Sequence, residues 1–218
     1  WLVCPFGAFF LRIVYNYMDT SDSIPLEETL EALGELVKQG KVRQIGLSNE
    51  TPWGTMKYLE LAETKSLPRV ASIQNAYNLV NRGFEIGLSE VAMHEQVGLL
   101  AYSPLAQGTL TGKYLGGQMP QGSRLALFGD GPLMMRYKGD KTQQAIEMYV
   151  NLAKKYEIDP AQLAIQFCNI QPFVTSTIIG ATTMEQLKTC IDSVDLDITK
   201  EIINEIRSIH KEIPNPAP

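Results

Sequence analysis

The sequence of 218 residues is 44% hydrophobic and 20% charged, with both signs of charge mixed along it. This composition predicts one soluble globular domain and excludes a disordered or fibrous chain. A formal net charge of −5 argues against a surface that binds nucleic acid or an anionic membrane, because either would need a dominant basic face. Any contact with a phosphate group must therefore be local.

The cysteine spacing and the start of the sequence indicate in which cell compartment the protein is expected. The cysteines lie far apart and form no C-x-x-C pair, which favours a reducing compartment: Cys4, Cys168 and Cys190. The apolar run at 1–14, about 14 residues long, is too short to span a bilayer, and no signal cleavage site follows it. Because the first residue is Trp1 rather than Met, we expect 1–25 to be a truncated start or an altered loop. The expected location is the cytoplasm, or a plastid if an upstream transit peptide has been lost.

Helix-like and strand-like segments alternate from about residue 26. Segment 26–39 places Leu30, Leu33 and Val37 on one face, and Gly40 stands where a helix would stop. Further helices are predicted at 53–64, 84–96, 142–156, 160–169, 184–191 and 199–213. Asp159 and Pro160 suit the N-cap and the first position of the helix at 160–169. Strands are predicted at 42–47, 70–74, 98–102 and 175–179.

Short strands separated by helices predict parallel βα units, with strands buried on both faces because helices cover them. Four such units form either a small doubly wound sheet or half of an eight-stranded barrel. The stretch 103–140 is rich in Gly and Pro, and we interpret it as a functional loop rather than a linker.

Polar residues stand at the carboxyl end of every predicted strand. A single such pair is ordinary, because loops begin where strands end. Four in succession favour a shared mouth, as in a βα barrel, where the active site lies at those ends. The four groups are Ser48 with Asn49, Gln74 with Asn75, Tyr102 with Ser103, and Gly180 with Thr182.

The segment 101–114 invites comparison with a phosphate-binding P-loop. Its glycines are separated by three residues instead of four, and Tyr114 replaces the hydroxyl residue that would bind magnesium, so we reject that interpretation. A G-x-G-x-x-G fingerprint is also absent from the sequence. The loop offers backbone donors around Gly108 and two cations, Lys113 and Arg124, which suit a pyrophosphate.

Four stretches, VRQIGLSNE, SIQNAYNLVNR, LLAYSPLAQGTLTGKY and IIGATTMEQL, resemble the second-half motifs of the aldo-keto reductases. The similar branch includes bacterial and plant reductases and potassium-channel beta subunits. The resemblance covers about 25–218 and implies an α/β fold that is a partial (β/α)8 TIM barrel. Residues 26–218 would supply its last four βα units and a C-terminal helix, while 1–25 match poorly.

The resemblance also implies roles in binding NADP(H). The nicotinamide carboxamide would be bound by Ser48, Asn49 and Gln74, and Tyr102 would stack on the ring. The residues expected around the pyrophosphate are Ser103, Leu105, Gln107, Gly108, Lys113 and Arg124. The adenosine 2′-phosphate would meet a helix N-terminus at Gly180, Thr182 and Gln186. Cys190 departs from the pattern, since relatives commonly have Asn facing the adenine.

The catalytic groups that the resemblance implies are a Tyr, a Lys, an Asp and a His, all from the first half of the barrel. His94 and His210 lie within predicted helices rather than at strand ends, so neither is given a role. Tyr15, Tyr17 and Asp19 lack the pattern that surrounds the family's catalytic pair. We therefore assign no catalytic residue and no metal ligand.

The function implied for the intact protein is reduction of a small-molecule aldehyde or ketone with NADPH, and the chain alone is expected to be inactive. One alternative is a regulatory subunit that senses NADP(H) and acts through a partner; another is a purely structural βα domain. The strands at 42–47 and 175–179 are expected to leave unpaired edges. We therefore expect the folded chain to be unstable unless a second copy or a separate amino-terminal half pairs with these strands.

Overall fold

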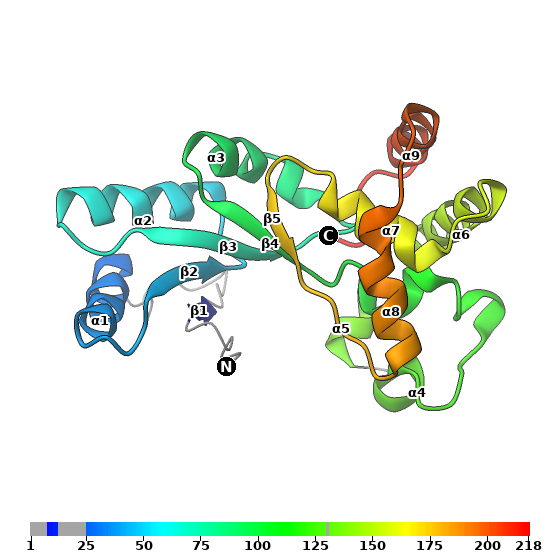
Figure 1. The fold of residues 1–218 in the computed structure, drawn as a ribbon, viewed down its shortest axis with the longest axis horizontal. Coiled ribbons are helices and arrows are strands. Elements are labelled where there is room, and N and C mark those ends of the chain that lie inside the picture. The colour runs from blue at the N-terminus through cyan, green and yellow to red at the C-terminus, as the bar shows by residue number, and fades with distance from the viewer. Residues whose placement is uncertain (1–7, 13–24, 130) are drawn as a thin grey trace. The chain divides into compact units, whose positions relative to one another are not determined.

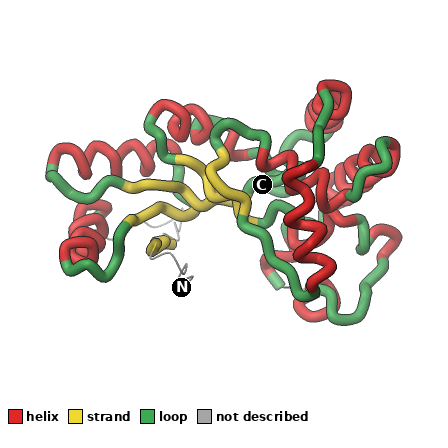
Figure 2. Tube along the Cα trace, viewed as in Figure 1, coloured by secondary structure: helices red, strands yellow, loops and turns green. Residues whose placement is uncertain are grey.

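The computed structural model describes residues 8–12, 25–129 and 131–218, which fall into two compact units. The first unit comprises the described residues up to 75 together with 85–100, and the second comprises 76–84 and 101–218. Helices and strands alternate along the chain (Figures 1 and 2), and the strands hydrogen-bond in the order β1-β2-β3-β4-β5.

The elements up to residue 102 are β1 (Ala8–Arg12), α1 (Leu26–Lys38), β2 (Gln44–Ser48), α2 (Pro52–Thr64), β3 (Val70–Ala76), the 3-10 turn η1 (Gly83–Glu85), α3 (Leu88–His94) and β4 (Gly98–Tyr102). The later elements are η2 (Ala106–Thr111), η3 (Leu115–Gly117), α4 (Arg124–Phe128), α5 (Pro132–Met135), α6 (Asp140–Lys155), α7 (Pro160–Asn169), β5 (Val174–Thr177), α8 (Met184–Asp192), η4 (Ser193–Asp195) and α9 (Lys200–Glu212).

Helix α1 forms where the apolar periodicity predicts it. Leu30 and Leu33 face inward and are 0% and 8% exposed. Acidic residues occupy its first turn and Lys38 its last, an order that suits the helix dipole. The helix ends just before Gly40, whose φ of 70° is a backbone conformation that glycine adopts without strain. The turn leads the chain into β2.

Strand β2 lies between β1 and β3 and is parallel to both. Leu47 pairs with Leu11 on one side and with Ile73 on the other. Ile45, Leu47 and Ile73 are almost completely buried, so the middle of this sheet lies in the core of the first unit. The carboxyl ends of β2 and β3 therefore lie side by side.

The core of the second unit forms around α7. Tyr77 stacks on Phe167 at 5.7 Å between ring centroids and meets Phe173 edge-on at 5.3 Å. Near the C-terminus, the backbone amide of Ala217 donates to the carbonyl of Val80 at 3.1 Å. The C-terminal residues are thus held against segment 76–84, which leads out of β3.

The predicted bounds of one strand and one helix are confirmed. The strand at 98–102 and the helix at 160–169 have the predicted bounds, and the Asp159 carboxylate caps α7 by accepting from the backbone amides of Ala161 and Gln162. The stretch 103–140 contains the short helices η2, η3, α4 and α5 within its loops. In the described parts of the chain, no helix is long and apolar enough to cross a membrane.

Other predictions were wrong. Strand β1 was not expected within the poorly matching segment, and it pairs with β2, so the predicted unpaired edge of β2 is not present. The single helix expected at 84–96 is divided into η1 and α3, because Gly87 lies between them with φ of 85°. Strand β5 is not buried on both faces, since Thr175 and Ser176 are exposed.

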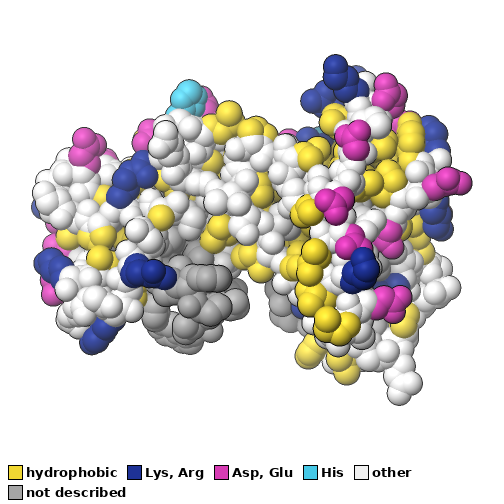
Figure 3. Space-filling view, viewed as in Figure 1, with side chains coloured by type: hydrophobic (Ala, Val, Ile, Leu, Met, Phe, Trp, Pro, Cys, Tyr) yellow, Lys and Arg dark blue, Asp and Glu magenta, His cyan; other side chains and the backbone are white. Residues whose placement is uncertain are grey.

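The surface of the second unit also carries apolar side chains. On α8, Met184 is 77% and Ile191 55% exposed, and Figure 3 shows hydrophobic atoms next to charged side chains on this part of the surface. Exposed apolar surface of this kind favours association. Pairing with a second copy stays a prediction.

Candidate cofactor site

Three of the predicted cofactor-binding residues lie at the carboxyl ends of β2 and β3. Ser48, the last residue of β2, is 7% exposed. The next residue, Asn49, donates its backbone amide to the carbonyl of Gln74 at 3.0 Å, which extends the hydrogen bonding of the two strands by one residue. Its side-chain amide donates to the Ser48 hydroxyl at 3.3 Å. The first unit therefore brings Ser48, Asn49 and Gln74 together.

A buried carboxylate, which the sequence analysis missed, supports this end of β2. Glu50 is 3% exposed, and its Oε1 accepts from the backbone amide of Thr51 at 2.8 Å and from its hydroxyl at 3.2 Å. The Thr51 hydroxyl in turn accepts from the amide of Gly54 at 3.0 Å and caps α2. The sequence places Thr51 and Pro52 directly after Glu50, a pair typical of a helix start, and nothing in it indicates that the Glu50 side chain turns inward.

Glu50 also connects β2 to the end of β3. The Asn75 side-chain amide donates to the Glu50 backbone carbonyl at 3.4 Å. Within the described residues, Glu50 Oε2 and Asn75 Oδ1 are buried without a hydrogen-bond partner. Buried acceptors without a donor are uncommon and often mark positions that bind water or a ligand.

The second group of predicted residues begins in the turn after β4. Ser103, Gln107 and Gly108 have φ values of 56°, 60° and 92°, so the backbone there repeatedly enters the left-handed region. The Asn78 side-chain amide fixes the start of the turn by donating to the Ser103 carbonyl at 2.9 Å. The amide of Gly108 donates to the Leu105 carbonyl at 2.8 Å and closes the turn.

Gly108 is required by its surroundings as well as by its φ angle. A Cβ at this position would lie 3.1 Å from both Cε and Nζ of Lys113. The Lys113 ammonium lies 5.1 Å from the ring centroid of Tyr114, a cation–π contact. The absence of a side chain at Gly108 thus allows the lysine to approach the backbone of the turn.

Arg124 joins this turn through a chain of hydrogen bonds. The guanidinium of Arg124 donates to Gln107 Oε1, and Gln107 Nε2 donates to the Ser103 hydroxyl at 3.0 Å. A Cβ at Gly180 would lie 3.9 Å from the arginine Nη2, so the cation also lies beside the segment after β5. Four predicted residues from distant parts of the sequence, Ser103, Gln107, Arg124 and Gly180, are therefore brought together within the second unit.

The remaining predicted residues lie at the start of α8. Thr183 caps this helix by accepting from the backbone amide of Gln186 at 3.2 Å. The Oε1 of Gln186 accepts from the backbone amide of Thr182 at 2.9 Å and from its hydroxyl at 3.0 Å. Thr182 and Gln186 are thus exposed and bound to one another, and a phosphate contacting Thr182 would have to replace the Gln186 oxygen.

A family model described as the aldo/keto reductase family matches residues 11–211. The chain belongs to the aldo/keto reductase family. It is 48% identical over 209 residues to Protein tas of Escherichia coli strain K12, covering 96% of the chain and 60% of that protein. It is 41% identical over 202 residues to an aldo-keto reductase of Babesia bovis, covering 89% and 70% respectively.

A probable voltage-gated potassium channel subunit beta of Oryza sativa subsp. japonica is 29% identical over 208 residues, which are 94% of this chain and 63% of that protein. The predicted branch of the aldo/keto reductases is therefore confirmed. The chain spans about 60% of the length of Protein tas.

Neither described histidine of this chain lies at a strand end. His94 is the last residue of α3 and is exposed, and His210 lies on α9. Tyr15, Tyr17 and Asp19 lie outside the described residues, as does Cys4. Among the described side chains, no group of three or more His, Cys, Asp or Glu could hold a metal ion.

The two described cysteines of this chain are free and buried. Burial raises the pKa of the Cys168 thiol, which lies against the carbonyls of Tyr77 and Ala164. Burial also raises the pKa of Cys190, and the nearby Asp159 carboxylate adds to this effect. Cys190 is therefore a buried thiol within α8.

Proposed function

We propose that this chain supplies the NADP(H)-binding part of an aldo-keto reductase whose barrel is a (β/α)8 fold, and that the proton-donating residues lie outside 26–218. The observation that carries the proposal is the arrangement of Ser103, Gln107 and Arg124 beside Gly180. In this arrangement a hydrogen-bonded guanidinium lies next to a turn of left-handed backbone.

The chemistry of these residues suits a dinucleotide phosphate. Guanidinium groups bind phosphate oxygens through strong, charge-assisted hydrogen bonds. Arg124 is exposed, so an anion can reach it without unfolding the loop. With an overall charge of −5, the chain would attract an anion through such local cations rather than through its net field.

The residues at the ends of β2 and β3 suit the carboxamide group of nicotinamide. Ser48, Asn49 and Gln74 offer hydroxyl and amide groups that both donate and accept, which is what a carboxamide requires. When bound, NADPH would supply the hydride for reduction of a small aldehyde or ketone. The role of this chain would be to bind and orient the nicotinamide, with Tyr102 against the ring.

Titration of the 218-residue chain with NADPH and with NADH tests the proposal, with nucleotide fluorescence as the signal. We expect NADPH to bind more tightly than NADH. Arg124→Gln should weaken NADPH binding by roughly tenfold or more, because a charge-assisted hydrogen bond contributes about 1.5–3 kcal/mol. Arg207→Gln, an exposed arginine on α9, is the matched control and should bind NADPH normally.

The 2′-phosphate position has its own test. Gln186→Glu should reduce the preference for NADPH over NADH, because a carboxylate at the start of α8 repels the phosphate. No fluorescence change up to about 1 mM cofactor, the concentration that corresponds to roughly −4 kcal/mol, would overturn the cofactor proposal.

A regulatory subunit is a second candidate, favoured by the similarity to the rice protein named as a potassium channel subunit beta. Both candidates predict cofactor binding by this chain without turnover of an aldehyde. They differ in the longer protein, which oxidises NADPH in the presence of an aldehyde only if it is a reductase. Steady NADPH consumption by the 218-residue chain alone would contradict the placement of the proton donor.

A further inference from the structure

Asn78 is a buried amide in the segment that leads out of β3, and its side chain makes several hydrogen bonds. The residue is 0% exposed. Its Oδ1 accepts from the backbone amides of Val80 at 3.0 Å and of Asn81 at 2.9 Å. Its Nδ2 donates to the Ser103 carbonyl at 2.9 Å, and the Tyr137 hydroxyl is a further hydrogen-bond partner of the side chain. Because both the oxygen and the nitrogen of the amide are bonded, its orientation is fixed.

The segment that contains Asn78 runs beside the end of β4. The backbone amide of Tyr77 donates to the Tyr102 carbonyl at 3.2 Å, one residue before the contact between Asn78 and Ser103. Tyr77 is itself buried and stacks on Phe167. Two successive residues of this segment therefore hold the backbone of Tyr102 and Ser103, two successive residues of the predicted cofactor site.

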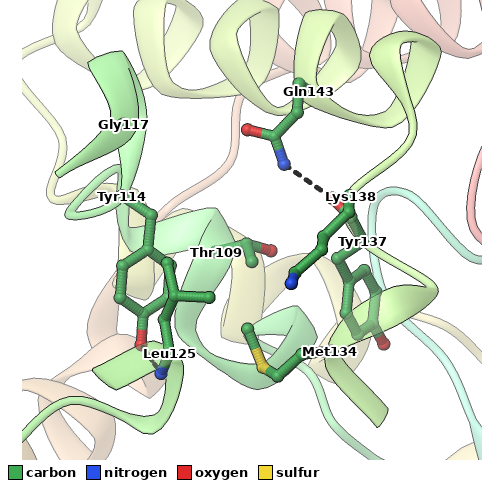
Figure 4. A pocket seen from close by; sticks show the side chains of 8 residues that line it. All are labelled: Thr109, Tyr114, Gly117, Leu125, Met134, Tyr137, Lys138 and Gln143. Atoms are coloured by element: carbon green, nitrogen blue, oxygen red, sulfur yellow. Dashed lines mark hydrogen bonds between the residues drawn. The ribbon is translucent and has the colours of Figure 1, made fainter. Parts of the chain in front are cut away.

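Ser103 has a backbone conformation that needs support. Its φ of 56° lies in the left-handed region, which is unfavourable for a residue with a Cβ atom. A pocket of about 310 Å³ lies beside this turn, because Thr109, which follows the turn, and Tyr137 both line it (Figure 4). Packing supports the turn less where this space is open, so hydrogen bonds such as the one from Asn78 contribute more to its position.

The position of Ser103 affects the cation of the site. The Ser103 hydroxyl accepts from Gln107 Nε2 at 3.0 Å, and Gln107 Oε1 accepts from the Arg124 guanidinium. A rotation of Ser103 would move the hydroxyl that holds the Gln107 side chain, and that side chain orients the guanidinium. The orientation of Arg124 therefore depends on Asn78 through two intermediate residues.

Residues 215–217 hold the segment to which Asn78 belongs. Asn215 Oδ1 accepts from the backbone amide of Arg82 at 2.8 Å. The backbone amide of Ala217 donates to the Val80 carbonyl at 3.1 Å, and Ala217 is buried. These two bonds fix the segment just after Asn78.

Helix α6 holds the same residues and Tyr137. The Thr142 hydroxyl donates to the Pro216 carbonyl at 2.7 Å. The Gln143 side-chain amide donates to the Tyr137 carbonyl at 2.6 Å, a bond that Figure 4 shows as a dashed line. Both bonds come from the first turn of α6. Asn78 is thus connected to α6 through Tyr137 and through residues 215–217.

We propose that Asn78 is a positioning residue for cofactor binding and that residues 215–217 keep it in place. Asn78 holds Ser103, so that Gln107 can orient Arg124 for a phosphate. Because Asn78 is 0% exposed, it acts through Ser103 and not by contact with the ligand. The inference rests on the proposed cofactor function, but the effect on the turn can be measured without a cofactor.

Hydrogen exchange of the 218-residue chain without nucleotide, followed by mass spectrometry, tests the effect on the turn. Asn78→Asp keeps an oxygen for the amides of Val80 and Asn81 but places a second oxygen against the Ser103 carbonyl. We expect peptides from 103–112 to exchange roughly tenfold faster, because a hydrogen bond is lost and two acceptors face one another. Peptides from α9 should exchange as in the unaltered chain.

Asn81→Asp is the matched control, because it adds the same charge to the same segment. The Asn81 Oδ1 accepts from the backbone amide of Gly83 and not from the turn after β4, and an aspartate oxygen can still accept there. Exchange in 103–112 should therefore stay as it is in the unaltered chain.

Titration of the same variants with NADPH tests the effect on the cofactor. Asn78→Asp should weaken NADPH binding by roughly tenfold, and Asn81→Asp by less than about twofold. Asn78→Ser adds no charge and has a side chain too short to reach Ser103. It should weaken binding by about three- to tenfold, and that loss could not come from repulsion of the anionic cofactor.

Deleting 214–218 tests the role of residues 215–217. The deletion should speed exchange in 78–83 and in 103–112 and weaken NADPH binding by roughly threefold or more, because two bonds to the segment of Asn78 are lost. Deletion of the exposed Pro218 alone is the control and should change neither exchange nor binding.

Several results would overturn the inference. One is exchange in 103–112 that is the same in Asn78→Asp as in the unaltered chain, and another is exchange that rises equally in 103–112 and in α9. Loss of the folded far-UV circular dichroism spectrum in both Asn78 variants would show that Asn78 supports the whole second unit and not this turn in particular. If the unaltered chain and the Asn78 variants bind NADPH equally well, the inference fails and the cofactor proposal stands. If the unaltered chain does not bind NADPH, the cofactor proposal fails, and with it the role of Asn78 in cofactor binding.

Discussion

Replacing Gly54 by Ala tests the buried position of Glu50 at the end of β2. A Cβ at residue 54 would lie 2.1 Å from Glu50 Oε1 and 2.5 Å from its Cδ, far inside van der Waals contact. The carboxylate would have to leave its place and give up the bonds from Thr51. Losing a hydrogen bond to a charged group costs about 1.5–3 kcal/mol, and the overpacking adds roughly 1–3 kcal/mol.

The helical preference of alanine over glycine offsets this loss by up to about 1 kcal/mol. We therefore expect Gly54→Ala to lower the free energy of unfolding by roughly 1.5–6 kcal/mol. In a Glu50→Ala background the clash is absent, and the same substitution should be neutral or stabilising. Urea unfolding followed by far-UV circular dichroism measures both effects in one double-mutant cycle.

One result of the double-mutant cycle would contradict the buried position of Glu50. If Gly54→Ala has the same effect on unfolding in both backgrounds, the Glu50 side chain does not occupy the space beside Gly54, and the account of how β2 ends is wrong. A coupling above about 1.5 kcal/mol would support it, because independent sites add to within about 0.5 kcal/mol.

Three further predictions concern the second unit. Asp159→Ala should lower the free energy of unfolding by about 1–2 kcal/mol through loss of the α7 cap, and Asp159→Asn should restore most of it, as thermal melts would show. Hydrogen bonds from Lys155 and then from Tyr156 lower the pKa of Glu205, so the stability they contribute is present above the ordinary Glu value of about 4.3 and is lost as pH falls through the lower folded value. Unfolding curves of Glu205→Gln should not show that loss; a pH dependence equal to that of the unaltered chain contradicts it. The thiol of Cys168 is buried and its pKa is raised, so a thiol reagent should label it only in urea, with labelled peptides identified by mass spectrometry. Rapid labelling of Cys168 in the native chain would show that α7 does not bury it.

Elements with local determinants could be predicted from the sequence. The apolar spacing of α1, the Asp159-Pro160 start of α7 and the short apolar run of β4 each specify an element with few partners from elsewhere. The positions of the polar strand ends followed from the same periodicity, so Ser48 and Tyr102 were expected where their strands finish. Cofactor roles for these residues came from the family resemblance and stay predictions.

Features that depend on contacts between distant residues could not be predicted. The pairing of β1 with β2 joins segments more than thirty residues apart, and nothing in the run around Phe10 specifies that partner. The hydrogen bond from Arg124 to Gln107 joins residues that are seventeen positions apart in the sequence. Long-range contacts of this kind depend on how the whole chain packs, because local periodicity reports only which face of an element is apolar.

Glu50 shows, at a single residue, what the sequence determines and what the tertiary structure determines. The sequence places a charged residue directly after a strand end, where exposure is the ordinary expectation. Tertiary structure buries it, because Thr51 supplies two donors and Gly54 leaves the space that the carboxylate fills. The sequence by itself thus determined the order of helices and strands and the polar character of the strand ends. The tertiary structure decided which of those side chains meet, since burial and hydrogen bonding are properties of the packed chain.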